Sequence, residues 1–299
     1  MRWLMLIFNG TKMEESSKVL ISGINGFTGI HLSKHLKSFG YKVYGIDCNI
    51  LDNTKVKEII HSVKPDYLIH LAANSFANEE NINSLYKVNV IGSLNILDSL
   101  NSLQMNLKKV ILSSSALVYG ESSNSINSED DPLMPINHYG CSKLCMENIS
   151  QYYFNKLPII ITRPYNYTGV GHDEKFIIPK IVKAHLTDQK SIELGNTEIY
   201  REFNDVRDVV VMYRLLMECN YSSIKVNLCS GKSHSIKEIL SLMTKISQKE
   251  IKVEFNPLFA RTNEIDKLSG SVIKLNEVIK YQPKYNINDT LEWMYLSGV

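Results

Sequence analysis

The feature that most constrains the fold is a regular alternation of strand-like and helix-like segments over the first half of the chain. The strand-like runs cover residues 18–23, 41–47, 66–73, 108–120 and 158–164, and the helix-like stretches cover 29–40, 53–65 and 83–103. Each strand-like run is almost continuously apolar, which is typical of parallel strands covered by helices on both faces. The alternation therefore predicts an α/β fold built on a doubly wound parallel sheet.

A glycine-rich turn joins the first strand-like run to the first helix. Gly23, Gly26 and Gly29 stand three apart in SGINGFTGIHL. Glycine permits a tight turn and lets the backbone approach a pyrophosphate, and the helix N-terminus offers free N–H groups to it. Such a triplet also occurs in ordinary strand-to-helix turns. Its position between a strand and an amphipathic helix favours dinucleotide binding on a Rossmann-type sheet.

An acidic residue, Asp47, ends the second strand-like run. Its carboxylate can accept hydrogen bonds from the adenosine ribose and would repel a 2′-phosphate, which favours NADH over NADPH. The alternative is that Asp47 belongs to the next turn. The residues predicted to bind NADH or NADPH are Gly23, Asn25, Gly26, Phe27, Thr28, Gly29, Asp47, Asn49, Ile50, Leu71, Ala72 and Ala73, together with Tyr139 and Lys143.

The alternation of strand-like and helix-like segments becomes irregular after residue 165. We expect a helix within 166–186, two paired strands within 191–203, a helix over 204–220, a strand over 225–231 that returns to the main sheet, and helices over 235–247 and 288–299. We therefore predict a Rossmann-type domain over 17–165 and 203–232, a smaller discontinuous C-terminal substrate-binding lobe over 166–202 and 233–299, and an N-terminal extension or alternative start over 1–16.

Composition and charge exclude several classes of protein. The formal net charge is +2 with acids and bases interspersed, so we expect no nucleic-acid partner and no binding to an anionic membrane. No apolar run approaches the length that spans a bilayer. The five cysteines show no zinc-ligand spacing, which predicts no metal site and reduced thiols in a cytoplasmic protein.

A serine, a tyrosine and a lysine are placed so that they can meet at one edge of the sheet. Ser115 lies in a strand-like run, and Tyr139 and Lys143 stand four apart in HYGCSKLC, on one face of the expected helix. The phenol can exchange a proton with a substrate oxygen, and the serine hydroxyl can hold that oxygen. We expect the lysine charge to lower the pKa of the phenol toward neutrality.

From Lys18 onward, nearly all of the chain resembles the extended short-chain dehydrogenase/reductases, in the group of nucleotide-sugar epimerases and dehydratases. In the first half the stretches SGINGFTG, HLAA, VNVIGSLNIL, SSSALVYG and YGCSK carry the resemblance. In the second half RPYNYTGVG, REFNDVRDVV, VNLCSGKSHSIKEIL and ARTNEI are similar to the GDP-4-keto-6-deoxy-mannose reductases and their relatives.

The resemblance implies that hydride from NADH or NADPH reduces the C4 ketone of a GDP-linked 4-keto-6-deoxy sugar, in deoxysugar biosynthesis for a surface polysaccharide. It also implies a homodimer. It assigns catalysis to Ser115, Tyr139 and Lys143. It assigns substrate binding to Ser114, Ser115, Ala116, Asn166, Arg201, Arg261 and Glu264.

The residues after Ser115 separate some activities of this group but not others. A sugar 4,6-dehydratase uses an acid and a base directly after the catalytic serine, where this chain has Ala116 and Leu117, so water elimination is not expected. A nucleotide-sugar 4-epimerase uses the same serine, tyrosine and lysine with a retained NAD and stays open, as does a non-catalytic NAD(P)-binding protein. Arg201 could also be a surface arginine paired with Glu198 or Glu202.

Overall fold

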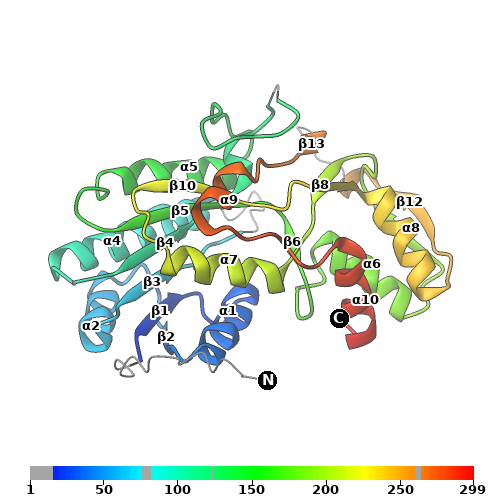
Figure 1. Ribbon diagram of the computed structural model, residues 1–299. Helices are drawn as coiled ribbons and strands as arrows, with labels where there is room; N and C mark the ends of the chain where they lie inside the picture. The colour runs from blue at the N-terminus through cyan, green and yellow to red at the C-terminus, as the bar shows by residue number, and fades with distance from the viewer. Residues whose placement is uncertain (1–15, 76–81, 123, 260–263) are drawn as a thin grey trace, which may run out of the picture.

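The computed structural model describes residues 16–75, 82–122, 124–259 and 264–299. The predicted N-terminal extension lies almost wholly outside these residues, as does Arg261. The chain forms a larger lobe around one sheet and a smaller lobe beside it (Figure 1). In the part of the chain that is described, no helix is long and apolar enough to cross a bilayer.

One six-stranded sheet organises the larger lobe. Its strands are β1 (Lys18–Ser22), β2 (Lys42–Ile46), β3 (Tyr67–His70), β4 (Lys109–Ser113), β5 (Ile159–Pro164) and β10 (Ile224–Leu228). They lie in the order β10-β5-β4-β3-β1-β2, and every neighbouring pair is parallel. The predicted α/β class with a Rossmann-type doubly wound sheet is therefore confirmed.

Helices cover both faces of this sheet because its strands are apolar on both sides. One face packs against α1 (Phe27–Ser38), α7 (Val206–Glu218) and α9 (Ile273–Ile279). The other face packs against α2 (Asn53–Val63), α4 (Ser93–Ser102) and α5 (His138–Gln151). Successive strand residues alternate between these two cores, as Leu20 and Ile21 do. Helix α9 falls within the range predicted for the second lobe, but it packs on the Rossmann sheet. The division into domains remains a prediction.

In the described part of the chain, the smaller lobe is built from short strands and three helices. Its elements are β6 (Tyr167–Thr168), α6 (Ile177–Leu186), β7 (Ser191–Leu194), β8 (Tyr200–Glu202), β9 (Asn204–Asp205), β11 (Ser233–Ser235), α8 (Ile236–Ser247), β12 (Lys252–Phe255), the 3₁₀ turn η4 (Pro257–Phe259), β13 (Lys267–Leu268) and α10 (Ile287–Ser297). Helices α6, α8 and α10 share one apolar core. As predicted, the chain returns to the main sheet between β9 and β11, where β10 pairs with β5.

Three predicted elements were wrong in detail. The two strands within 191–203 do not pair with each other, since β7 pairs with β12 and β8 lies between β11 and β13. The helix expected over 83–103 is divided into α3 (Ile82–Tyr86), a π-helical segment η2 (Lys87–Gly92) and α4. Within η2, the Asn89 side chain bonds the backbone of Asn74 and the hydroxyl of Ser142, contacts that no local pattern reveals.

The third correction concerns the strand expected over 108–120. Strand β4 ends at Ser113, and a 3₁₀ turn, η3 (Ala116–Val118), comes after it. The physical cause is Ser115, whose hydroxyl oxygen accepts a hydrogen bond from the Leu117 N–H and caps the turn. This turn leaves Ser115 at the carboxyl end of β4.

A fully buried ion pair ties β5 to α5. Arg163 donates from Nε and Nη2 to the two carboxylate oxygens of Glu147 at 3.0 and 2.8 Å, and both side chains are at most 1% exposed. Its Nη1 also donates to the Tyr119 hydroxyl and to the Glu129 carbonyl. The Ser114 hydroxyl donates to Glu147 at 2.6 Å. The pair therefore connects two strands, a helix and the loop after η3.

We predict that Arg163→Leu lowers the free energy of unfolding by about 3–5 kcal/mol, because it leaves the Glu147 carboxylate buried without its main partner. Urea unfolding of purified protein measures this. The matched control is Lys237→Leu, which breaks an exposed pair with Glu198 and should cost less than about 1 kcal/mol. If both substitutions lowered the free energy of unfolding equally, the buried pair would contribute no more to stability than the exposed one.

Candidate active site

The three predicted catalytic residues come from two neighbouring elements at the carboxyl edge of the sheet. Ser115 lies just beyond the end of β4, and Tyr139 and Lys143 lie in the first two turns of α5. The helix begins where the Asn137 side chain accepts a hydrogen bond from the Gly140 N–H at 2.8 Å. This cap fixes Tyr139 in the first turn, where it faces the turn that carries Ser115.

A close backbone approach brings these elements together. A methyl group on Gly140 would lie 2.5 Å from the carbonyl oxygen of Leu117, so only glycine allows α5 to pack this tightly on η3. The Ser115 hydroxyl comes within hydrogen-bonding reach of the Tyr139 hydroxyl. The Lys143 Nζ lies 5.8 Å from the centroid of the Tyr139 ring and donates to the Ser113 carbonyl at 2.7 Å.

The protonation of the phenol differs from the prediction. Burial raises the pKa of Tyr139 above its ordinary value, and the hydrogen bond with Ser115 offsets this only in part. The expectation that Lys143 lowers this pKa toward neutrality is wrong for this structure, because desolvation is the largest effect. Burial also lowers the pKa of Lys143 itself, to about 8, against the opposing attraction of Glu147. The site thus holds a protonated phenol beside an ammonium that deprotonates readily.

The glycine turn fits a pyrophosphate. Gly23 has a φ of 72°, and a methyl group on it would lie 2.8 Å from the Ala72 nitrogen. A methyl group on Gly29 would lie 2.2 Å from the Gly23 carbonyl, so α1 starts in close contact with the end of β1. Gly26 is the N-cap of α1 and supplies no side chain to its first N–H groups. These donors can therefore bind an anion.

The other predicted cofactor residues lie on this turn or in the segments after strands β2 and β3. Asn25 is exposed on it, and Asp47 is exposed directly after β2. Ile50 is instead buried in the core, so its side chain packs rather than faces solvent. The Asn49 side chain accepts a hydrogen bond from the Leu51 N–H. Leu71, Ala72 and Ala73 come directly after β3 and remain partly exposed.

The predicted substrate residues are distributed between the lobes. Ser114 is buried and its hydroxyl is bound to Glu147, so its side chain points away from the Ser115 side. Ala116 is buried beside Ser115. Asn166 is exposed where the chain enters β6, and its carbonyl is held by Asn204. Glu264 is partly exposed, and the role predicted for Arg261 falls outside the described residues.

The two glutamates considered as alternative partners of Arg201 are bound elsewhere. Glu198 pairs with Lys237 at 3.2 Å. Glu202 is fully buried and accepts hydrogen bonds from the N–H groups of Ser230, Gly231 and Gly270. The Arg201 guanidinium donates from Nη1 to the carbonyls of Tyr200 and Asp266. Its anchoring role stays a prediction.

One residue that contacts the site was missed by the sequence analysis. Tyr167 comes directly after Asn166, in β6, and its hydroxyl lies 2.6 Å from the Thr28 hydroxyl in the first turn of α1. Its ring is stacked on Phe27, with centroids 6.1 Å apart. The Tyr167 phenol is also close enough to Tyr139 for their charges to interact. No sequence signal marks this contact, because Tyr167 and Thr28 stand 139 positions apart.

Comparisons with known proteins identify the family. The family model described as GDP-mannose 4,6 dehydratase matches residues 46–294. A GDP-6-deoxy-D-talose 4-dehydrogenase of Aggregatibacter actinomycetemcomitans is 32% identical over 287 residues, covering 93% of this chain and 97% of that protein. A GDP-6-deoxy-D-mannose reductase of Pseudomonas aeruginosa is 24% identical over 292 residues, covering 92% and 95%.

Solved structures share the same architecture. A putative epimerase from Burkholderia cenocepacia J2315 has a TM-score of 0.90 at 33% identity, covering 95% of this chain and 98% of that chain. RMD from Pseudomonas aeruginosa, complexed with NADPH, has a TM-score of 0.86 at 23% identity, covering 95% and 97%. The chain belongs to the extended short-chain dehydrogenase/reductases, in the NAD-dependent epimerase/dehydratase family. Within that family it is an NAD(P)-dependent nucleotide-sugar oxidoreductase, as the sequence predicted.

We predict that the bond between Tyr167 and Thr28 holds the glycine turn in shape for the cofactor. Tyr167→Phe and Thr28→Val should each raise the dissociation constant of the reduced cofactor about fivefold, as expected for one lost hydrogen bond. The double variant should be no weaker than either single variant, since both remove the same bond. Fluorescence titration of NADH and NADPH measures these constants.

The control for these single and double variants is Tyr153→Phe. It removes the hydroxyl of a buried tyrosine that bonds Asp98, outside the residues assigned to the cofactor, and it should leave cofactor binding unchanged. Additive effects of Tyr167→Phe and Thr28→Val would mean that the two hydroxyls act separately.

Proposed function

We propose that the protein reduces the C4 ketone of a GDP-linked 4-keto-6-deoxy sugar, with NADH or NADPH as hydride donor. Two relatives that align along almost their whole length are named for oxidation or reduction of GDP-6-deoxy sugars, and one of these names specifies position 4. The sequence resemblance of the second half points to the same substrate class. The talose enzyme is named for oxidation at position 4, which is the reverse of the proposed reduction. The two directions of one reaction use the same side chains.

The observation that carries the proposal is the placement of the proton donor Tyr139 beside Ser115 and Lys143 at the carboxyl edge of the sheet. Tyr139 is a phenol that burial keeps protonated, beside Ser115 and Lys143. Reduction of a ketone needs such a group, because a proton must reach the oxygen as hydride reaches the carbon. The two residues after Ser115 are Ala116 and Leu117, which cannot transfer the protons that water elimination requires.

Each of the three side chains has a distinct role in this reaction. The Ser115 hydroxyl accepts from the Leu117 N–H, so its own hydrogen can be directed at the C4 oxygen. Tyr139 gives its proton to that oxygen as the carbonyl double bond is reduced. The Lys143 ammonium then stabilises the phenolate that remains. The bound cofactor supplies the hydride, and the uncapped start of α1 holds its pyrophosphate.

The smaller lobe would hold the nucleotide sugar. Asn166 stands at its border, on the segment that also carries Tyr167, and we assign it to the sugar or its diphosphate. Arg201 lies in β8, where a guanidinium can grip a diphosphate with two parallel hydrogen bonds. We assign Arg261 and Glu264 to the nucleotide. Asp47 favours NADH, although the relative RMD was solved with NADPH.

A nucleotide-sugar 4-epimerase is the second candidate. The Burkholderia protein, which is 33% identical, is described as an epimerase. Such an enzyme uses the same three catalytic groups and returns its cofactor to the starting state. Consumption of reduced cofactor separates the two activities. A role limited to NAD(P) binding is disfavoured, because all three catalytic side chains are present and close together.

We expect purified protein to oxidise NADH or NADPH in proportion to product when it is given a GDP-linked 4-keto-6-deoxy sugar. Absorbance of the reduced nicotinamide and chromatography of the sugar measure both sides of the reaction. Comparison of kcat/KM for the two cofactors tests the role of Asp47. Tyr139→Phe, which removes only the proton donor, should lower turnover by about 10²–10⁴-fold. Interconversion of two sugar epimers without net cofactor consumption would replace the proposal with the second candidate.

The activity should also depend on the charge of Lys143. Its pKa of about 8 means that the ammonium is lost as the pH rises through that value. Because the charge stabilises the developing phenolate, kcat/KM for the keto sugar should fall above pH 8, while cofactor affinity, measured over the same range, should change less. A flat kcat/KM profile through alkaline pH would show that the charge of Lys143 is not needed.

A further inference from the structure

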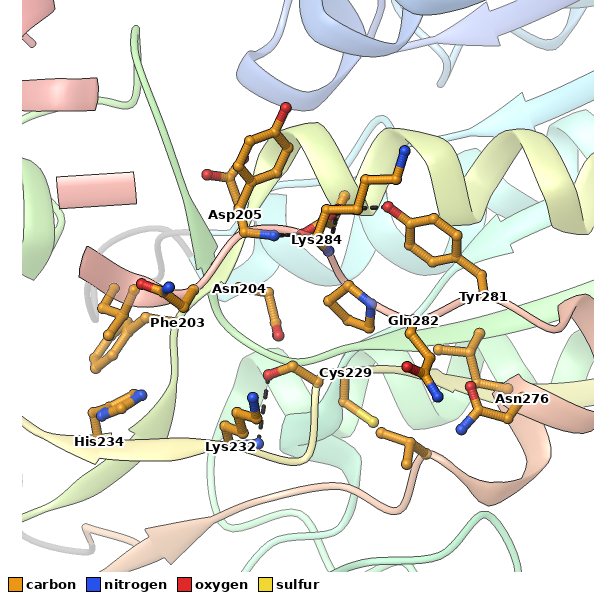
Figure 2. Close-up of a pocket in the computed structure, with 18 residues that line it drawn as sticks. Phe203, Asn204, Asp205, Cys229, Lys232, His234, Asn276, Tyr281, Gln282 and Lys284 are labelled. Atoms are coloured by element: carbon orange, nitrogen blue, oxygen red, sulfur yellow. Dashed lines mark hydrogen bonds between the residues drawn. The ribbon is translucent and has the colours of Figure 1, made fainter. Parts of the chain in front are cut away.

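Buried polar side chains lie on both faces of the main sheet. At the start of α7, Asp205 and Asp208 border a cavity of about 360 Å³, and Asp208 accepts a hydrogen bond from the Tyr281 hydroxyl at its rim (Figure 2). On the opposite face, five polar side chains of the sheet, η2, α4 and α5 are at most 2% exposed: Ser22, His70, Asn89, Ser93 and Ser142. Unlike the groups around the cavity, these five form a hydrogen-bonded chain that reaches the catalytic helix.

His70, the last residue of β3, is the centre of this chain. The Ser93 hydroxyl donates its only hydrogen to the Asn89 carbonyl at 2.7 Å, so at 2.8 Å from the ring it must accept from His70 Nε2. The proton of the neutral ring is therefore on Nε2, and Nδ1 accepts from the Ser22 hydroxyl at 2.6 Å. The contacts thus define a single tautomer of His70.

The ring of His70 is uncharged at ordinary pH. Burial lowers its pKa to about 3, and the charge of Lys143 acts in the same direction. A protonated ring would present a second N–H to the Ser22 hydroxyl, whose hydrogen would then need another acceptor. The order of donors and acceptors along the chain is therefore fixed.

One end of the chain holds the cofactor turn. Ser22 is the last residue of β1 and directly precedes Gly23. Its hydroxyl oxygen accepts a hydrogen bond from the Ala72 N–H at 3.2 Å, and the Ala72 nitrogen is the atom that a methyl group on Gly23 would meet. The bond from Ser22 to His70 therefore holds the ends of β1 and β3 together, where the turn approaches the segment after β3.

The other end of the chain reaches the catalytic helix through Asn89 in η2. The Asn89 Nδ2 donates to the Ser142 hydroxyl at 2.9 Å. Ser142 in turn donates to the Tyr139 carbonyl at 2.8 Å, and it directly precedes Lys143 in α5. The chain therefore runs from the residue before the glycine turn to the helical turn that carries both catalytic side chains of α5.

We propose that His70 is a positioning residue that couples the cofactor turn to the catalytic helix, so that the placement of the nicotinamide cofactor and that of Tyr139 and Lys143 depend on one hydrogen-bonded chain. His70 is 2% exposed, so it acts through Ser22 and Ser93 and not on the reacting atoms. The coupling concerns the NAD(P)-dependent reaction. Only its kinetic test rests on the proposed function.

The order of donors is tested by NMR of protein labelled with ¹⁵N in its histidine rings. The signals of His70 are those lost in His70→Phe. We expect a neutral ring with its proton on Nε2, unchanged between about pH 5 and 8, where an ordinary histidine titrates. The Nε2–H proton signal should shift when NADH or NADPH binds. A ring that titrates in this range, carries its proton on Nδ1 or does not respond to the cofactor overturns the proposal.

Cofactor affinity separates positioning from stability alone. His70→Phe keeps a ring but loses two hydrogen bonds, and it should raise the dissociation constant of the reduced cofactor about fivefold to tenfold. The matched control is His185→Phe, which removes a buried histidine whose Nδ1 lies 2.7 Å from the Ser247 hydroxyl in the smaller lobe. It should lower the free energy of unfolding in urea but leave cofactor affinity unchanged.

An unchanged dissociation constant in His70→Phe, or an equal rise in His185→Phe, would reduce His70 to a structural role. If His70→Phe is not recovered folded, Ser93→Ala takes its place. It removes one bond of the ring, so the dissociation constant should rise about threefold to fivefold, and no rise again overturns the proposal.

The coupling to α5 is tested by kcat with a GDP-linked 4-keto-6-deoxy sugar at saturating cofactor. His70→Phe and Ser142→Ala interrupt the chain at different places, and each should lower kcat about tenfold. The double variant should be no slower than the slower single variant, because both break the same connection. Additive losses, about a hundredfold in the double variant, would show that the two residues act separately. If the wild-type chain turned over no such sugar, the proposed function would fail, and the NMR and cofactor measurements would still decide the role of His70.

Discussion

The ion pair between Arg163 and Glu147 is the interaction on which the catalytic end of the molecule depends. Two opposite charges are buried together with all their hydrogen-bonding groups directed at each other or at close neighbours. Glu147 lies one helical turn after Lys143, and Ser114, which also donates to Glu147, precedes Ser115. The pair therefore sets the position of α5 relative to β4 and β5. Gly140 then allows the final approach that brings Tyr139 to Ser115.

Local patterns were sufficient to predict the sheet and most of the catalytic centre. Apolar runs such as 18–22 and 159–161 indicate buried parallel strands by their own composition, whichever element comes next in the chain. Gly23 and Gly29 mark the cofactor turn, because a methyl group added to them would lie 2.8 and 2.2 Å, respectively, from a backbone atom. The helical spacing of Tyr139 and Lys143 places both on one face of α5. Each of these patterns can be recognised within a short stretch of sequence, even though the close approach at Gly23 is to the distant Ala72.

Features that depend on distant partners were not predictable. Strands β7 and β8 are close in sequence, but their hydrogen-bonding partners come from later segments. The contact of Tyr167 with Thr28 joins two lobes, and the Asn89 contacts that shape η2 reach another helix. The pKa of Tyr139 depends on how deeply its hydroxyl is desolvated, which only packing determines. The presence of Lys143 four residues after Tyr139 therefore predicted the wrong direction for the shift of this pKa.

The order of strands in the sheet has a consequence for synthesis of the chain. Strand β5 can pair with β4 as soon as it leaves the ribosome. Its other edge pairs with β10, which is synthesised only after the excursion, the intervening residues 165–223. At ~5–20 residues per second, translation of that excursion takes several seconds. During that time an apolar strand has unpaired backbone groups on one side, a state prone to aggregation. The nascent chain therefore needs shielding, by its own helices or by a chaperone, for longer than a protein whose strands pair in the order of synthesis.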